Sequence, residues 1–381
     1  MSRERVKKEK MAKSRIDYSL LVVVAFLIGF GLVMLYSSSY YTASIKFGDS
    51  AWYLKKQIVA TALSVLALVF FSALDYKRWK RWTWIIYIIS VLSVFAVMSP
   101  IGIEANGAKR WVDLGFLTVQ PAEIVKISVI LLMAAVLSVS ASKMEKLLDL
   151  CIVFILAIVP AGVIYIVTDN LSSAVIVAAI GVVMLIVACK NNKTFIIMII
   201  LAAIVVLVAV FFIGGFRAGR ILVWLDPEKY SSEGGFQVLQ GLYAIGSGGL
   251  FGKGLGQSVQ KLGFVPEAQN DMIFTIVCEE LGLFGGIAVL LLFAFLVWRF
   301  MVIANNADDL FGAMIVVGVM AHIAIQVILN VAVVTATVPN TGITLPFISY
   351  GGSSILFLMS EIGLVLSVAR HRQNRQEEKR R

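Results

Sequence analysis

Ten long apolar stretches dominate this 381-residue chain and limit the folds open to it. They lie near residues 18–39, 53–74, 83–99, 122–140, 149–167, 172–189, 194–214, 271–300, 310–337 and 349–369. Each is close to the ~20 residues that a helix needs to cross a hydrocarbon core ~30 Å thick. Only helices and closed barrels satisfy every backbone group in lipid, and these stretches lack the alternation of barrel strands. The sequence therefore predicts an all-α polytopic membrane protein with ten transmembrane helices.

The positions of the basic residues predict how the chain crosses the membrane. Lys and Arg gather in the tails, residues 1–17 and 370–381, and in cytoplasm-side loops such as 75–82. Because Lys and Arg favour the cytoplasmic side, both tails are expected inside, which an even number of spans allows. Residues 18–369 then form one membrane domain of the bacterial cytoplasmic membrane. Its loops at 100–121, 216–270 and 338–348 face outward.

The net charge of +10 follows from the same distribution. Basic tails beside an anionic leaflet explain it, so no nucleic-acid partner is expected. The three cysteines, Cys151, Cys189 and Cys278, lie in apolar stretches without CxxC spacing. They are expected to be small buried side chains rather than members of disulfides or zinc sites.

The outer loop at 216–270 carries the densest polar chemistry of the chain. Asp271 follows its end, where the next apolar stretch begins. An ionised residue beside a spanning segment is by default a candidate functional residue, although a helix dipole also favours a carboxylate there. Within the loop, residues 236–245 have the apolar spacing of a short interfacial helix. The glycines of 248–256 predict a turn where backbone can approach a ligand, but they do not match a Walker phosphate loop.

Four cations on the predicted outer side run against the positive-inside trend. They are Lys109, Arg110, Arg217 and Arg220. An anionic headgroup is the plainest reason for cations in these loops. The run from Pro339 to Ser354, with two prolines and three glycines, predicts a fixed, non-helical outer turn, although a generic loop and helix cap would look similar.

The remaining ionisable residues in the spans can be explained by structural roles alone. Glu123 and Lys126 are three residues apart on one helix and can neutralise each other. On a straight helix Glu279 would lie ~12 Å deeper than Asp271. Glu280 is expected to be buried and satisfied by hydrogen bonds or cations from neighbouring helices. His322, in an apolar stretch, is expected to be a satisfied buried histidine.

Three of these clusters together resemble the signatures of the SEDS proteins (shape, elongation, division and sporulation), represented by FtsW and RodA. The matching segments are Pro339–Ser354, Pro266–Phe274 followed by Glu279–Gly282, and Lys109–Trp111 with Gln120–Glu123. They occur in the family's order over nearly the whole chain. Residues 254–258 and Lys261 are more similar to the FtsW branch than to RodA. Asn270 and Met272 depart from the residues expected at those positions.

The resemblance implies a peptidoglycan glycosyltransferase that polymerises lipid II into β-1,4-linked strands on the outer membrane face. It implies Asp271 as the general base and a class B penicillin-binding protein, a transpeptidase, as partner. Substrate-binding residues are expected among the cations above, supported by Glu123, Lys261 and Ser349. A divalent cation, Mg²⁺ or Mn²⁺, is suggested by the family and by the pyrophosphate leaving group. The cell process served, whether division, elongation or sporulation, is left open.

Two other functions stay open on the sequence alone. A lipid II flippase would use Glu123, Lys126, Glu279 and Glu361 to line a path across the membrane, whereas the polar loops concentrate on one side. A non-catalytic scaffold would recruit other cell-wall synthesis proteins, and this role can coexist with catalysis.

Overall fold

The computed structural model describes residues 17–378 except 106, 116–117, 142–146 and 189–215. In this part of the chain, eight helices are long and apolar enough to cross a membrane. They are α2 (Tyr18–Phe47), α3 (Trp52–Ala73), α6 (Pro121–Ser140), α7 (Leu147–Thr168), α8 (Leu171–Ala188), α12 (Ile273–Asn305), α13 (Leu310–Val334) and α14 (Gly352–Glu378). Their positions confirm a polytopic helical membrane protein.

Of the other two expected spans, one forms shorter helices and one lies outside the described residues. The stretch near 83–99 forms α5 (Thr83–Ser93), which continues as the 3₁₀ helix η1 (Val94–Met98) and is shorter than the eight. The stretch 194–214 lies outside the described residues. The count of ten spans therefore stays a prediction.

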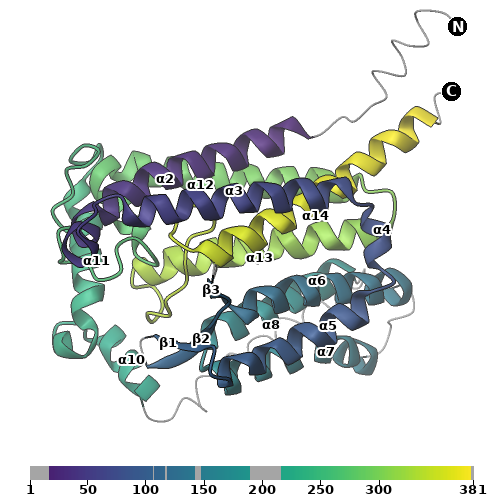
Figure 1. The fold of residues 1–381 in the computed structure, drawn as a ribbon, viewed down its shortest axis with the longest axis horizontal. Coiled ribbons are helices and arrows are strands. Elements are labelled where there is room, and N and C mark those ends of the chain that lie inside the picture. The colour runs from purple at the N-terminus through teal and green to yellow at the C-terminus, as the bar shows by residue number, and fades with distance from the viewer. Residues whose placement is uncertain (1–16, 106, 116–117, 142–146, 189–215, 379–381) are drawn as a thin grey trace, which may run out of the picture.

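The helices form two groups joined by α13. Figure 1 shows α2, α3, α12, α13 and α14 side by side, with α5, α6, α7 and α8 as a second group. α14 packs along α3, whereas α13 packs on both α6 and α8 across the boundary between the groups. A Cβ at Gly318 of α13 would lie 2.5 Å from the Ile130 side chain of α6, so glycine allows this close crossing.

The loops expected to face outward gather at one end of the bundle. Figure 1 shows α10 (Phe216–Leu225), α11 (Gly235–Gly248) and the strands at the end opposite to the start of α2 and the finish of α14. The short helices α4 (Tyr76–Trp79) and η3 (Ser231–Glu233) complete the described helices, with α4 at the same end as the start of α2. The segment expected at 236–245 is the centre of α11. This arrangement agrees with the predicted grouping of the loops.

A small antiparallel sheet in the first of these loops corrects the prediction of an all-α chain. Strands β1 (Gly102–Ala105), β2 (Ala108–Asp113) and β3 (Thr118–Val119) pair in that order, with Ile103 opposite Trp111. Gly107 has a φ of +75° in the turn between β1 and β2. Outside the hydrocarbon core water can satisfy the sheet edges, so the lipid constraint that excludes open sheets does not apply to this loop.

Helix α12 is interrupted at Gly282, whose φ of 68° and ψ of −167° are not helical. The glycine turn before it packs against this break: Gly254 N–H donates to the Glu280 carbonyl at 2.9 Å, and Leu283 N–H donates to the Gly249 carbonyl at 2.9 Å. A Cβ at Gly282 would lie 2.3 Å from the nitrogen of Gly252. The close backbone approach predicted for these glycines is thus made to α12.

Candidate active site

A cavity of about 970 Å³ lies between the two helix groups. Its walls come from α3, the small sheet, the first turns of α6 and α8, the turn before α12 and the loop before α14. Asp271, Arg110 and Glu123 all line it. Three sequence clusters that are far apart in the chain therefore meet around one space.

Asp271 is held in place through the backbone of its turn. The Asn330 amide of α13 donates to the Asp271 carbonyl at 2.8 Å. The Ser349 hydroxyl donates to the Asn270 carbonyl at 2.6 Å, and the Tyr350 N–H donates to the Gln269 carbonyl at 2.9 Å. Three successive carbonyls thus accept bonds from other segments, which fixes where the Asp271 side chain begins.

The carboxyl of Asp271 is buried, with 9% of the residue exposed, and its Oδ1 has no hydrogen-bond partner. Burial raises the pKa of this carboxyl to about 7, and the negative charge of Glu267 adds to the effect while backbone hydrogen bonds oppose it. Asp271 therefore changes its charge near neutral pH. A carboxylate with this pKa suits general-base work, because efficient proton transfer needs a pKa near the working pH.

Cationic side chains also line the cavity. Arg110 on β2 donates from Nη2 to the Asp169 carbonyl at 2.9 Å, just before α8. The α8 N-terminus is capped by Asn170, whose Oδ1 accepts from the Ser173 N–H at 3.0 Å. A helix N-terminus beside a guanidinium favours anionic groups. Lys55 and Lys56 of α3 line the same cavity and were not singled out from the sequence, although their place on the outer side of a span was an available signal.

Glu123 and Lys126 form a buried ion pair at 2.7 Å in the first turn of α6, which Pro121 begins. The expectation that they neutralise each other is confirmed. Both line the cavity, and Oε2 of Glu123 has no hydrogen-bond partner. This oxygen is available to a donor group in the cavity.

Lys109, Arg220 and Ser349, three other expected substrate-binding residues, are not among the residues that line the cavity. Lys109 is exposed and pairs in register with Glu104 rather than lining the cavity. Arg220 donates to the Asn340 carbonyl at 3.4 Å. Ser349 is occupied by its own backbone bonds, since its hydroxyl also accepts from the Leu345 N–H at 2.8 Å. The side chain of Arg217 lies outside the described part of α10.

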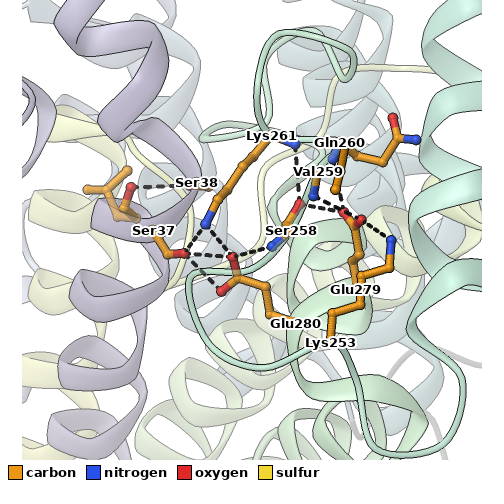
Figure 2. Close-up of polar contacts among 10 residues, drawn as sticks. Ser37, Ser38, Lys253, Ser258, Val259, Gln260, Lys261, Glu279 and Glu280 are labelled. Carbon is orange, nitrogen blue, oxygen red and sulfur yellow. Dashed lines mark hydrogen bonds and ion pairs between the residues drawn. The ribbon is translucent and has the colours of Figure 1, made fainter.

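Lys261 belongs to a buried polar network rather than to the cavity. Figure 2 shows its ammonium between Glu280 and Ser37, at 2.6 Å from Glu280 Oε1 and 2.9 Å from the Ser37 hydroxyl of α2. The Ser37 hydroxyl also donates to both oxygens of Glu280. Lys261 therefore supports the loop that leads to Asp271 and does not face the cavity.

Glu279 is held in the same network by the outer loop. Lys253 pairs with it at 2.7 Å, the Val259 N–H donates to it at 3.1 Å, and the Ser258 hydroxyl donates to it as well. The expectation that Glu280 is buried and satisfied is confirmed, but its cation comes from a loop instead of a helix. Residues of the outer loop therefore fold onto Glu279, which is fully buried.

The described residues contain no group of three or more His, Cys, Asp or Glu side chains that could hold a metal ion. They do not by themselves fit a resident divalent cation. A Mg²⁺ ion commonly takes most of its ligands from water and substrate phosphates, so the cation stays a prediction to be tested. No chemical step is assigned to it.

Comparison with known proteins agrees with this geometry. A family model described as "Cell cycle protein", covering FtsW, RodA and SpoVE, matches residues 18–374. The chain is 36% identical over 360 residues to stage V sporulation protein E of Bacillus subtilis, covering 94% of this chain and 98% of that protein. It is 34% identical over 372 residues to the probable peptidoglycan glycosyltransferase FtsW of the same organism, covering 95% and 92%.

Solved structures show the same fold. A chain from a structure described as "Structural coordination of polymerization and crosslinking by a peptidoglycan synthase complex" aligns with a TM-score of 0.76 at 26% identity, covering 94% of this chain and 98% of that one. A variant of the rod shape determining protein RodA of Thermus thermophilus aligns with a TM-score of 0.69 at 25% identity, with the same coverage. The protein is thus a member of the SEDS family of FtsW, RodA and SpoVE.

Proposed function

We propose that this protein is a peptidoglycan glycosyltransferase that polymerises lipid II at the outer face of the bacterial cytoplasmic membrane. The observation that carries the proposal is a buried Asp271, with a pKa of about 7, in a cavity that cationic side chains also line. The relatives named as peptidoglycan glycosyltransferases support the same activity.

In this reaction Asp271 is the general base. It accepts the proton of the acceptor sugar's 4-hydroxyl as the hydroxyl oxygen attacks C1 of the donor sugar. The new C1–O bond forms while the bond from C1 to the pyrophosphate oxygen breaks, and undecaprenyl pyrophosphate leaves with the electron pair. Attack from the opposite side inverts the α-linked donor to a β-1,4 linkage.

Cationic groups that line the cavity stabilise the negative charge that develops on the leaving group. Arg110 and the N-terminus of α8 would stabilise the pyrophosphate, since preorganised donors at a developing charge lower the barrier. On the α3 side, Val59 and Leu63 line the cavity with apolar side chains that are 62% and 41% exposed. This apolar wall suits a polyprenyl tail that enters from the lipid.

The topology proposed with this function places the cavity and the three outer loops on the extracytoplasmic side and both tails in the cytoplasm. The partner proposed is a class B penicillin-binding protein, which would crosslink the strands made here. A structural relative from a peptidoglycan synthase complex supports such a pairing.

The deciding experiment compares Asp271→Asn with the wild type, using purified protein, lipid II and gel separation of the glycan products. The variant is expected to lose at least 10²-fold in rate because the base is gone. Ser140→Ala, at the far end of α6 from the cavity, is the matched control and should polymerise normally. Strand synthesis by Asp271→Asn at the wild-type rate would overturn the assignment of the base.

A flippase is less well supported than a polymerase, because the four charged residues that would line its path are already bound to other groups. Glu123 and Lys126 bind each other, Glu279 binds the outer loop, and Glu361 pairs with Nδ1 of His322 at 2.9 Å. Nε2 of that buried histidine has no hydrogen-bond partner, so His322 is only partly satisfied. Reconstituted vesicles that report flipping and polymerisation separately discriminate the two activities. A pure scaffold predicts that cells carrying only Asp271→Asn remain viable.

A further inference from the structure

Glu267 stands four residues before Asp271 in the same turn and lines the same cavity. Its φ is +53°, in the left-handed region that a glutamate rarely adopts. Backbone strain of this kind persists only where the surrounding structure imposes it, and it is concentrated at functional sites.

The surrounding turn fixes this strained residue. The Asn270 side-chain amide donates to Oε2 of Glu267, and the Asn270 N–H donates to the Glu267 carbonyl at 2.9 Å. Asn270 is in turn held by Ser349, as described above. The Glu267 side chain is exposed to solvent, and these two bonds hold it to the turn that carries Asp271.

Neither carboxyl has a cationic partner close enough for an ion pair among the described residues. Two acidic groups thus line one cavity, while the buried Lys126 of the same cavity is paired with Glu123. A negative charge on Glu267 disfavours ionisation of the Asp271 carboxyl, and this makes the Asp271 carboxylate a stronger base. Such an arrangement costs stability and is useful where proton transfer is needed.

We propose that Glu267 is a positioning residue of the polymerase, whose fixed negative charge makes the neighbouring Asp271 a stronger base toward the acceptor hydroxyl. This inference rests on the proposed role of Asp271. It is supported by the effect of Glu267 on the Asp271 pKa, which is second only to burial.

The other charged and titratable side chains around the cavity act on Asp271 less directly. Lys55 pairs with Asp49 at 2.8 Å, and Lys56 lies 4.0 Å over the Trp52 ring. No ionisable side chain of α8 or α13 lines the cavity in the described part of the chain. The full set besides Glu267 and Asp271 is Lys55, Lys56, Arg110, Asp113, Glu123, Lys126 and Tyr350.

The test is the pH profile of kcat/KM for polymerisation by the purified full-length protein. In the wild type the acid limb should have its midpoint near the Asp271 pKa of about 7. In Glu267→Gln the midpoint should move down by on the order of 0.5 to 1 pH unit. One unit below the wild-type midpoint, the variant should then retain about 2.6- to 5.5-fold more of its own plateau rate.

Two variants separate charge from structure. Glu267→Asp keeps the charge and should keep the wild-type midpoint, whereas Glu267→Asn removes it and suits a positive φ, which guards against a failure of Glu267→Gln to fold. Asp113→Asn, which removes another carboxylate from the same cavity, should leave the midpoint in place. An unmoved or raised midpoint in both neutral variants, or an equal shift in Glu267→Asp, would overturn the proposal.

A second readout does not depend on catalysis. With the three native cysteines replaced by alanine, Asp271→Cys places a thiol at the same position, and the pH dependence of its alkylation gives the thiol pKa. Adding Glu267→Gln should lower that pKa by a similar amount. A lowered thiol pKa with no change in the enzyme's pH profile would refute Asp271 as the base, whereas an unchanged thiol pKa would refute the influence of Glu267.

Discussion

Replacing Lys261 with methionine should destabilise the protein far more than replacing Lys253 in the same way. Lys261 is 1% exposed and its partner Glu280 is fully buried, so Lys261→Met leaves an uncompensated carboxylate. Breaking a buried pair by removing one partner costs about 3–5 kcal/mol. Lys253 keeps 34% of its side chain exposed, and Glu279 retains the Ser258 and Val259 bonds without it. Glu279 is itself fully buried, but the Lys253 ammonium reaches solvent, so Lys253→Met should cost less than Lys261→Met.

The measurement is the free energy of unfolding of each variant in detergent micelles, from denaturant titrations followed by tryptophan fluorescence. The double variant Lys261→Met with Glu280→Gln removes both charges and should recover part of the loss, because it leaves no unpaired buried ion. Equal destabilisation by Lys261→Met and Lys253→Met would refute the argument that burial sets the energy of this network.

Further predictions concern pH, backbone, cation and leaving group. The free energy of unfolding of the wild type should fall as pH rises from about 4 to about 7, because the Asp271 carboxyl has a higher pKa in the folded than in the unfolded protein. Asp271→Asn should flatten this pH dependence. Above pH 7 the variant should be more stable than the wild type by on the order of 2 to 4 kcal/mol. Gly282→Ala places a Cβ 2.3 Å from Gly252 in a backbone conformation that alanine disfavours, so a loss of about 2 kcal/mol or more in unfolding free energy is expected. EDTA should abolish polymerisation and Mg²⁺ or Mn²⁺ should restore it; full activity after chelation removes the cation from the mechanism. Arg110→Ala should lower kcat/KM at least tenfold, whereas Lys109→Ala, outside the cavity, should change it less than twofold.

Hydropathy predicted the spans well because the lipid requires the residues of a span to be mostly apolar. The eight long helices begin within a few residues of the expected positions, from α2 at Tyr18 to α14 at Gly352. The sheet was missed because its strands are short, β3 having only two residues, and lie in a loop where that requirement is absent. Local composition there carries little periodicity.

The candidate site was predictable in part. Asp271, Arg110 and Glu123 were singled out and line one cavity, because unusual charges at a span boundary are visible in the sequence. The direction in which a side chain points is not visible in the sequence. Lys261 points into a network completed by Ser37, more than 200 residues away, and only the folded chain brings them together. The left-handed backbone of Glu267 is equally invisible in its residue type.

The three carbonyls that precede α12 are held by segments made much later, up to Tyr350. During synthesis, Asp271 leaves the ribosome roughly eighty residues before the last of these partners. A nascent chain that is paused in this interval already contains Asp271 but lacks the hydrogen bonds that position its side chain. We therefore expect activity only once the final helix is entering the bilayer, and fragments that end before Tyr350 are expected to be inert.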